Sequence, residues 1–504
     1  MKSFWARLQL WNSKECDLWP RWIFLRALGV IFFSAFYSLW FQIHGLIGER
    51  GILPVESFLA NVGAAVPGVK RFWYVPSLFW IDASDRALTV VVAAGLGCSI
   101  LVIANVMPKL TIALSTLFFL SCIAVLQDFS SYQSDGMLLE AGFISIFFAP
   151  VGIRPGLGSA DPPTRASRFM LQWEWFRIYF ESGVAKIASG DIHWRNFTAM
   201  DDYYQNGPLP AWPGWYVQHL PHWYHAATVV ATLVIELGIV WALFLPRRLR
   251  LACFVIVTGL QIGIIATANY AFLNYLVLVL GVLLLDDRAL ARFGLRLREA
   301  AAPALTTARE WRLGLEYFVM AWLLYATVVV FLASGSNSAL SWPEHVLEPF
   351  RFANPYGLFA TMTEARYEIE FQGSRDGGKT WIAYPFRYKP QDIKERPGIY
   401  APYQPRFDWN LWFASLGPWR SSDWVVRAQQ RLLEGSPSVL ALFRSDPFAG
   451  APPTQVRTVL WQYWFTDWKT KRETGAWWRR QELGLFSGVL TKGANGQMIL
   501  SDSP

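Results

Sequence analysis

Cysteine and charge are both scarce in this chain. Only 4 of its 504 residues are cysteine, and their wide spacing excludes a disulfide framework and every Cys-rich zinc pattern. Charged residues make up 16% of the chain, and hydrophobic residues reach 53%. A typical soluble domain is about 25% charged, so the composition argues against a soluble enzyme of ordinary type.

The sequence also lacks the signs of nucleic-acid binding and the common catalytic motifs. The net charge of +8 comes from short basic clusters rather than one tract interleaved with aromatic residues, so we expect no nucleic-acid partner. The sequence has no HExxH, no P-loop, no Rossmann glycine fingerprint and no GxSxG elbow. Although four histidines lie close together, no ligand at a familiar interval completes a metal site. We therefore predict no metal and no cofactor; the histidines are His193, His219, His222 and His225.

Long apolar runs are what the chain has in abundance. A bilayer crossing needs about 20 apolar residues. Runs of that order occupy 22–44, 87–107, 225–246, 250–268 and 316–334. Shorter or more polar candidates occupy 110–127, 137–152, 169–187 and 271–286. The sequence predicts an α-helical polytopic membrane bundle of about nine segments within 22–334, embedded in the lipid bilayer.

The Lys and Arg clusters predict how these segments are oriented. Cytoplasmic loops carry an excess of basic residues, and counting nine segments places every major cluster on one side. The segment 1–21 and the cluster Arg247, Arg248 and Arg250 are then cytoplasmic. The loops 45–86 and 188–224 fall on the exoplasmic side, together with everything from 335 to 504.

Residues 335–504 are expected to form a soluble domain that contains β structure. Tyr367, Ile369 and Phe371 alternate with Arg366, Glu368 and Glu370, the period of a half-buried strand, as the sequence shows. A Gly-rich turn at 374–381 follows, then a second strand, so the pattern predicts a hairpin. Its Ser and Asp spacing fits the Asp-box, whose plainest interpretation is a turn that satisfies its own hydrogen bonds. Helices are predicted at 421–434 and 438–444.

Charged residues within apolar segments are costly at membrane depth and indicate function by default. Glu174, Arg177 and Glu181 are spaced three and four apart, so a helix places them on one side. They form either the wall of an interior cavity or a structural ion-pair network. Glu140 and Glu236 are isolated carboxylates that must pair or be protonated, with Arg177, Arg26 and Lys186 as available partners. Lys186 itself could reach the membrane interface by snorkelling.

Several stretches of the chain have a recognisable pattern: MLLEAGFISIFFAP (137–150), 181–210, the segment ending in WYVQHLP, 356–390 and 400–417. They resemble the lipase maturation factor family. The resemblance implies a multi-pass membrane protein that acts as a chaperone-like maturation factor for secreted lipases, and we expect it not to be an enzyme. The membrane is that of the endoplasmic reticulum in animals, or the plasma (inner) membrane for a bacterial relative, which the few cysteines and the SDSP terminus fit better.

Under this interpretation an exported client protein, a lipase by the resemblance, binds exposed aromatic surface of the soluble domain. The candidates are Trp409, Trp412, Trp461, Trp464 and Trp468.

Two alternatives belong to other classes. GVAKIASGDIHW (183–194) resembles the stretch of vitamin K-dependent γ-carboxylases that carries a lysine base, which would make Lys186 catalytic in an intramembrane enzyme. No second catalytic group accompanies it. A transporter would need broken helices or paired repeats, and Asn269 and Asn274 between short apolar runs are the only hint of one.

Overall fold

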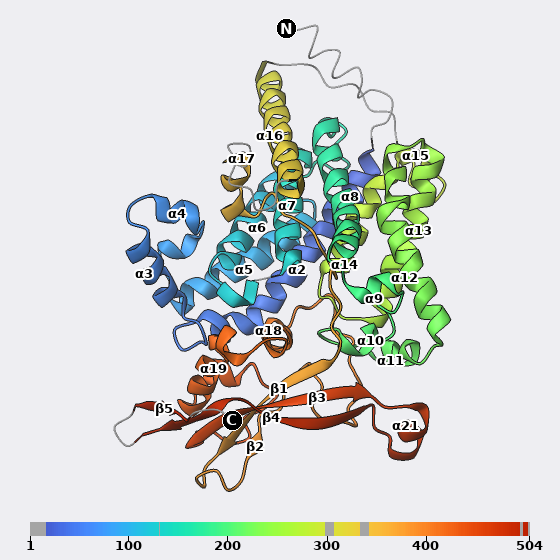
Figure 1. The fold of residues 1–504 in the computed structure, drawn as a ribbon. Helices are drawn as coiled ribbons and strands as arrows, with labels where there is room; N and C mark the ends of the chain where they lie inside the picture. The colour runs from blue at the N-terminus through green and yellow to red at the C-terminus, as the bar shows by residue number, and fades with distance from the viewer. Residues whose placement is uncertain (1–16, 131, 298–306, 333–341, 494–496, 502–504) are drawn as a thin grey trace.

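The protein consists of a helical bundle with a β-sheet domain packed against one end (Figure 1). The computed structural model describes residues 17–130, 132–297, 307–332, 342–493 and 497–501. Most of the predicted segment 1–21 and the start of the predicted soluble domain, at 335–341, lie outside the described residues.

Each of the predicted membrane segments contains a helix. Five helical stretches are long and apolar enough to cross a membrane, as judged by length and composition. α6 has 16 residues and rises about 24 Å, short of a hydrocarbon core of about 30 Å. Nine crossings are therefore not confirmed. The helices are α2 (Leu18–Ile47), α5 (Asp85–Ile103), α6 (Pro108–Ile123), α7 (Gln133–Phe148), α8 (Arg165–Ala188), α12 (His222–Leu237) continued by η3 (Ile239–Phe244), α13 (Arg247–Thr267), α14 (Leu273–Gly281) and α16 (Thr307–Leu332).

α8 lies inside the bundle, in contact with α7, α12, α14 and α16. It begins at a side-chain cap, because the Thr164 hydroxyl oxygen accepts a hydrogen bond from the Ser167 amide. Neighbours on several sides bury most of its residues, including the charged ones, which a helix at the edge of a bundle would expose to lipid or water.

Short helices connect the bundle on the side of the sheet. The loop 45–86 contains α3 (Val55–Ala65), α4 (Lys70–Tyr74) and η1 (Leu78–Trp80), and the loop 188–224 contains α9 (Ile192–Arg195), α10 (Tyr203–Asn206) and α11 (Trp212–Gln218). α9, α10 and α11 lie at the end of the bundle that faces the sheet, whereas α15 (Asp287–Ala291) lies at the far end (Figure 1).

The C-terminal sheet has five antiparallel strands in the order β2-β1-β3-β4-β5. The predicted hairpin is confirmed: β1 pairs with β2, with Gln372 opposite Ala383. Its turn satisfies itself, since the amides of Lys379 and Thr380 donate to Asp376. These bonds and the Thr380 hydroxyl lower the pKa of Asp376 to about 2. The strands are β1 (Arg366–Ser374), β2 (Ile382–Ala383), β3 (Gln455–Phe465), β4 (Trp478–Lys492) and β5 (Met498–Leu500).

Helices of the same domain pack between the sheet and the bundle. α19 (Asp423–Leu433) confirms the helix predicted at 421–434, whereas α20 (Pro437–Leu440) ends before the predicted 444. α19 contacts β3 and β4, and α20 contacts α2. The approach is close: a Cβ atom at Gly45 would lie 2.5 Å from the carbonyl oxygen of Ser438. The remaining helices are α17 (Trp342–His345), α18 (Arg406–Ser415) and α21 (Trp468–Thr474).

Basic residues of two clusters pair with carboxylates at the end of the bundle opposite the sheet, Arg247 with Asp286 at 2.5 Å and Arg312 with Asp161 at 2.5 Å. The loops 45–86 and 188–224 instead contact the sheet domain: Arg431 donates to the Gly51 carbonyl, and Asn206 donates to that of Thr363.

We expect a cysteine replacing Lys379, exposed on the hairpin turn, to react with an impermeant maleimide in intact cells. A cysteine replacing the exposed Arg248 at the start of α13 should react only after permeabilisation. The background variant carries no other cysteine. Labelling of Arg248→Cys in intact cells, with protection of Lys379→Cys, would reverse the orientation.

Candidate functional site

A row of charged side chains lies buried between α7 and α8. Glu174, Arg177 and Glu181 of α8 are each at most 3% exposed, as is Glu140 of α7. Arg177 donates to Glu140, and its nearest nitrogen lies 3.8 Å from Glu181. Glu174 differs from the others, because neither of its carboxylate oxygens has a hydrogen-bond partner among the described residues. The structure therefore brings together four of the predicted polar residues.

The partner of this row is an extended segment that precedes the sheet. Residues 351–363, which we call the strap, run from α17 through the bundle to β1 (Figure 1). Arg177 donates to the carbonyl of Asn354 at 2.8 Å. The Tyr356 amide donates to Glu181 at 2.8 Å, and the Tyr356 hydroxyl donates to Glu140 at 2.8 Å. Side chains of the bundle thus satisfy backbone groups that secondary structure leaves unpaired.

The same pattern continues along the strap toward the sheet. Lys186 donates to Glu236 at 3.0 Å and to the carbonyl of Leu358 at 2.8 Å. The Leu358 amide donates to the Ser182 hydroxyl at 3.1 Å. Farther on, the Trp194 indole donates to the carbonyl of Phe359 at 3.0 Å. Hydrogen bonds to the bundle therefore hold the strap along its length. The expectation that everything from 335 onward belongs to the soluble domain is corrected for this segment.

Lys186 does not snorkel to the interface, since it is 3% exposed and faces the interior. Its ammonium lies 2.9 Å from the second oxygen of Glu236 and 5.2 Å from the ring of Trp194. Of the partners considered for Glu236, the structure selects Lys186; for Glu140 it selects Arg177. This is the geometry of a structural ion pair that also positions the strap.

A second buried pair, Asp135 and Arg406, joins the bundle to the soluble domain. Asp135 of α7 accepts two hydrogen bonds from Arg406 of α18, both of 2.7 Å, and both side chains are 0% exposed. Arg406 also donates to the carbonyl of Phe129 at 2.8 Å. No local sequence pattern reveals this pair, because the two residues are 271 positions apart. Asp135 in the first turn of an apolar segment was the one available signal.

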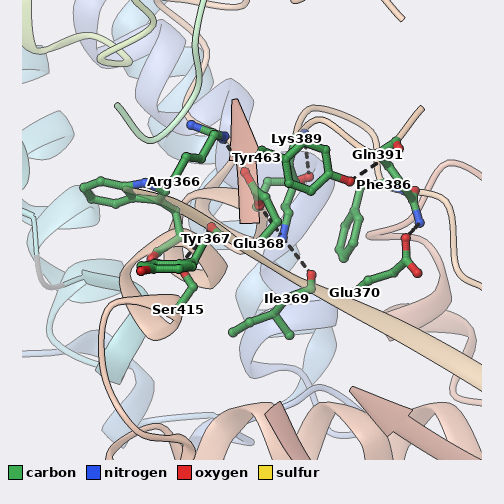
Figure 2. A network of polar contacts seen from close by, with 12 residues as sticks. Arg366, Tyr367, Glu368, Ile369, Glu370, Phe386, Lys389, Gln391, Ser415 and Tyr463 are labelled. Atoms are coloured by element: carbon green, nitrogen blue, oxygen red, sulfur yellow. Dashed lines mark hydrogen bonds and ion pairs between the residues drawn. The ribbon is translucent and has the colours of Figure 1, made fainter. Parts of the chain in front are cut away.

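Strand β1 is buried on both faces, which corrects the half-buried strand that the alternation predicted. Arg366 and Glu368 are 0% and 2% exposed. Glu368 lies between two cations, Arg366 and Lys389, and the Lys389 Nζ atom is 2.7 Å from a carboxylate oxygen of Glu368 (Figure 2). Arg366 also donates to the carbonyl of Pro208 at 3.1 Å, in the loop 188–224. The charged face is buried because this loop and the segment around Lys389 cover it.

Asp408 of α18 lies near this cluster and accepts bonds from the amides of Tyr388 and Lys389, both of 3.3 Å. Burial raises the pKa of Asp408 to about 6, against the attraction of Lys389. The soluble domain therefore carries a second buried charge cluster that the sequence analysis did not single out.

The five tryptophans predicted to bind a client differ in exposure. Trp409 and Trp412 are 7% and 8% exposed, which corrects the expectation that they are accessible. The Trp412 indole donates to the carbonyl of Asn206 at 3.0 Å, so it serves the contact with the loop 188–224. Trp468 on α21 is 48% exposed.

Trp461 and Trp464 on β3 are half-buried. Guanidinium groups from β4 lie over both rings: Arg480 is 4.1 Å from the centroid of Trp461, and Arg479 is 4.7 Å from that of Trp464. Because Trp461 and Trp464 are three residues apart in a regular stretch of β3, their side chains lie on opposite faces of the sheet. We use the name aromatic surface for Trp464 and Trp468. The predicted histidines do not cluster around a metal, and among the described residues no group of three or more His, Cys, Asp or Glu could hold one.

We expect Arg177→Met to destabilise the protein more than Glu174→Gln does. Removing the guanidinium leaves Glu140 buried without its cation and frees a strap carbonyl, at a cost of about 3–5 kcal/mol. Glu174→Gln removes no hydrogen bond made to a described residue. Thermal unfolding in detergent measures both variants. Equal melting temperatures for wild type and Arg177→Met would show that the row is not a buried network.

Two sequence models match the chain in succession. The lipase maturation factor transmembrane domain matches residues 19–292, and the lipase maturation factor C-terminal domain matches residues 352–487. The second match begins at the strap, where the structure also places the change from bundle to soluble domain. No solved structure matches the chain.

Curated relatives match over nearly the whole length. Lipase maturation factor 2 of Gallus gallus is 31% identical, over 94% of this chain and 82% of the relative. The Homo sapiens protein of the same name is 31% identical, over 93% and 82%. Lipase maturation factor 1 of Mus musculus is 31% identical, over 92% and 86%. The chain is a membrane protein and belongs to the lipase maturation factor family.

Proposed function

We propose that the protein is a membrane-embedded maturation factor that helps exported proteins, with secreted lipases as the client class, to reach their active state. The names of its relatives support the client class. The observation that carries the proposal is the strap, because its buried bonds fasten a soluble domain with an aromatic surface to a membrane bundle.

The proposed mechanism uses this attachment. A partly folded client exposes apolar surface, and tryptophan offers a large contact area at a low entropic cost. The aromatic surface supplies Trp468 at 48% exposure. Arg479 over Trp464 limits the exposure of that ring while the client is absent. Because the domain is fixed to the bundle, the client is held near the membrane it has just crossed.

The proposed location follows from the family and the charge pattern. We place the protein in the endoplasmic reticulum membrane, or in the plasma membrane if its source is bacterial, with the soluble domain on the exoplasmic side. This is the side on which exported clients fold.

We expect Trp468→Ala combined with Trp464→Ala to lower the activity of the secreted client strongly. Loss of central aromatic contacts costs about 2 kcal/mol or more in binding, or roughly a 30-fold loss of affinity. The measurement is secreted lipase activity per unit of membrane-inserted protein in a null strain.

Trp311→Ala is the matched control for the tryptophan variant, since Trp311 is 80% exposed at the far end of the bundle. The double variant must also retain wild-type protease resistance of the soluble domain. Wild-type rescue by a correctly folded double variant would rule out the aromatic surface as the client site.

If Lys186 acts only as an ion-pair partner of Glu236, the effect of replacing Lys186 should be compensated by also removing the charge of Glu236. Lys186→Met should destabilise the protein by about 3–5 kcal/mol, because it leaves Glu236 buried without its cation. Adding Glu236→Gln removes that charge, so the double variant should recover part of the stability and of the client activity. A double variant that is as stable as wild type yet inactive would instead favour Lys186 as a catalytic base.

A further inference from the structure

A pocket of about 360 Å³ opens between the short helices of the loop 45–86, beside the bundle. The helices α3 and α4, in blue at the left of Figure 1, form two of its walls. The third wall, residues 79–83, ends two residues before α5, one of the five candidate spans. The pocket is therefore continuous with the start of a membrane span, where lipid headgroups lie.

Exposed apolar side chains lie in and beside this pocket. Ile81, which lines it, is 85% exposed. Val69, Phe72 and Tyr74, in or next to α4, are 81%, 45% and 54% exposed. Such exposure is unfavourable in water, whereas aromatic and aliphatic side chains are favoured at a membrane–water interface. The two observations together place the pocket at headgroup depth with these side chains in contact with lipid.

Both signs of charge line the pocket without neutralising each other. The guanidinium of Arg71 lies 5.0 Å from the ring of Trp80, and it makes no ion pair with any described residue. Its Nε is buried and has no hydrogen-bond partner. Glu56 and Asp82 also line the pocket, and among described residues neither pairs with a cation within 4.0 Å. Both oxygens of Asp82 accept a hydrogen bond from Ser84, at 2.9 Å and 3.0 Å, which leaves Glu56 as the carboxylate without a described partner.

We propose that this pocket binds the headgroup of a phospholipid that carries a primary amine, as phosphatidylethanolamine does. Arg71 presents a planar fork of donors that matches a phosphate. Glu56 and Asp82 accept hydrogen bonds from the ammonium, which a quaternary choline group cannot donate. Gly63 leaves space for the headgroup beside Arg71, since a Cβ atom at this position would lie 3.6 Å from Arg71 Nη1 and 3.8 Å from the Trp80 ring.

The test uses the full-length protein in nanodiscs made from equal parts of phosphatidylethanolamine, phosphatidylcholine and phosphatidylglycerol. Native mass spectrometry then counts the lipids that stay bound. We expect phosphatidylethanolamine to be retained above its share of the nanodisc lipid, and by its enrichment we mean the number of these molecules bound per protein. Arg71→Gln should lower this number about tenfold, since Arg71 binds the phosphate and a charge-assisted hydrogen bond is worth that factor or more. Lys70→Gln, its exposed neighbour on α4, is the matched control and should retain wild-type enrichment.

A second variant tests the pocket by shape alone. Gly63→Phe keeps every charge but fills the space beside Arg71, so it should lower the enrichment as far as Arg71→Gln does. Both variants should keep the wild-type melting temperature in lipid-free detergent, which separates lost binding from unfolding.

Three outcomes would overturn the proposal. They are equal enrichment in wild type and Arg71→Gln, a preference for phosphatidylglycerol, and displacement of the bound lipid by soluble phosphoethanolamine at equal concentration. The last would identify a free phosphomonoester as the ligand.

Discussion

The arrangement of this protein depends on one requirement, that polar groups withdrawn from water find partners. The bundle buries Glu140, Arg177, Glu181 and Lys186, and the strap buries backbone groups that belong to no helix or strand. Each set satisfies the other, because side chains of α7 and α8 bond to the strap from Asn354 to Leu358. Neither arrangement is favourable alone, since an unpaired buried polar group costs several kcal/mol.

Buried charge pairs act mainly by fixing how the segments that carry them are placed relative to each other. Desolvation offsets much of their attraction, so they add little net stability, whereas breaking one is costly. Asp135 with Arg406 and Glu368 with Arg366 and Lys389 follow this logic at the contact between the two parts. An altered docking of the soluble domain would separate Arg406 from Asp135 and remove the Pro208 carbonyl from Arg366. The aromatic surface therefore keeps a fixed orientation relative to the helical bundle.

Burial also decides which aromatic residues are available for binding. Trp412 is 8% exposed and Trp468 is 48% exposed, in line with their neighbours in the sequence, which are apolar for Trp412 and charged for Trp468. Trp412 is buried because its indole bonds to Asn206 in the loop 188–224. Trp468 stays accessible although it contacts Trp215 of the same loop, with ring centroids 4.7 Å apart. The loop therefore defines the aromatic surface as much as the soluble domain does.

Features that depend on neighbouring residues follow from the sequence alone. The apolar runs form helices, the Gly-rich turn at 374–381 forms a hairpin whose turn satisfies its own hydrogen bonds, and 421–434 forms α19, because hydropathy, turn chemistry and helix capping act over a few residues. The spacing of Glu174, Arg177 and Glu181 likewise places them in one buried row. The entry of the strap into the bundle and the burial of Arg366 depend instead on packing between distant segments. A buried charge is satisfied by whichever distant segment packs against it, and nothing local specifies that segment.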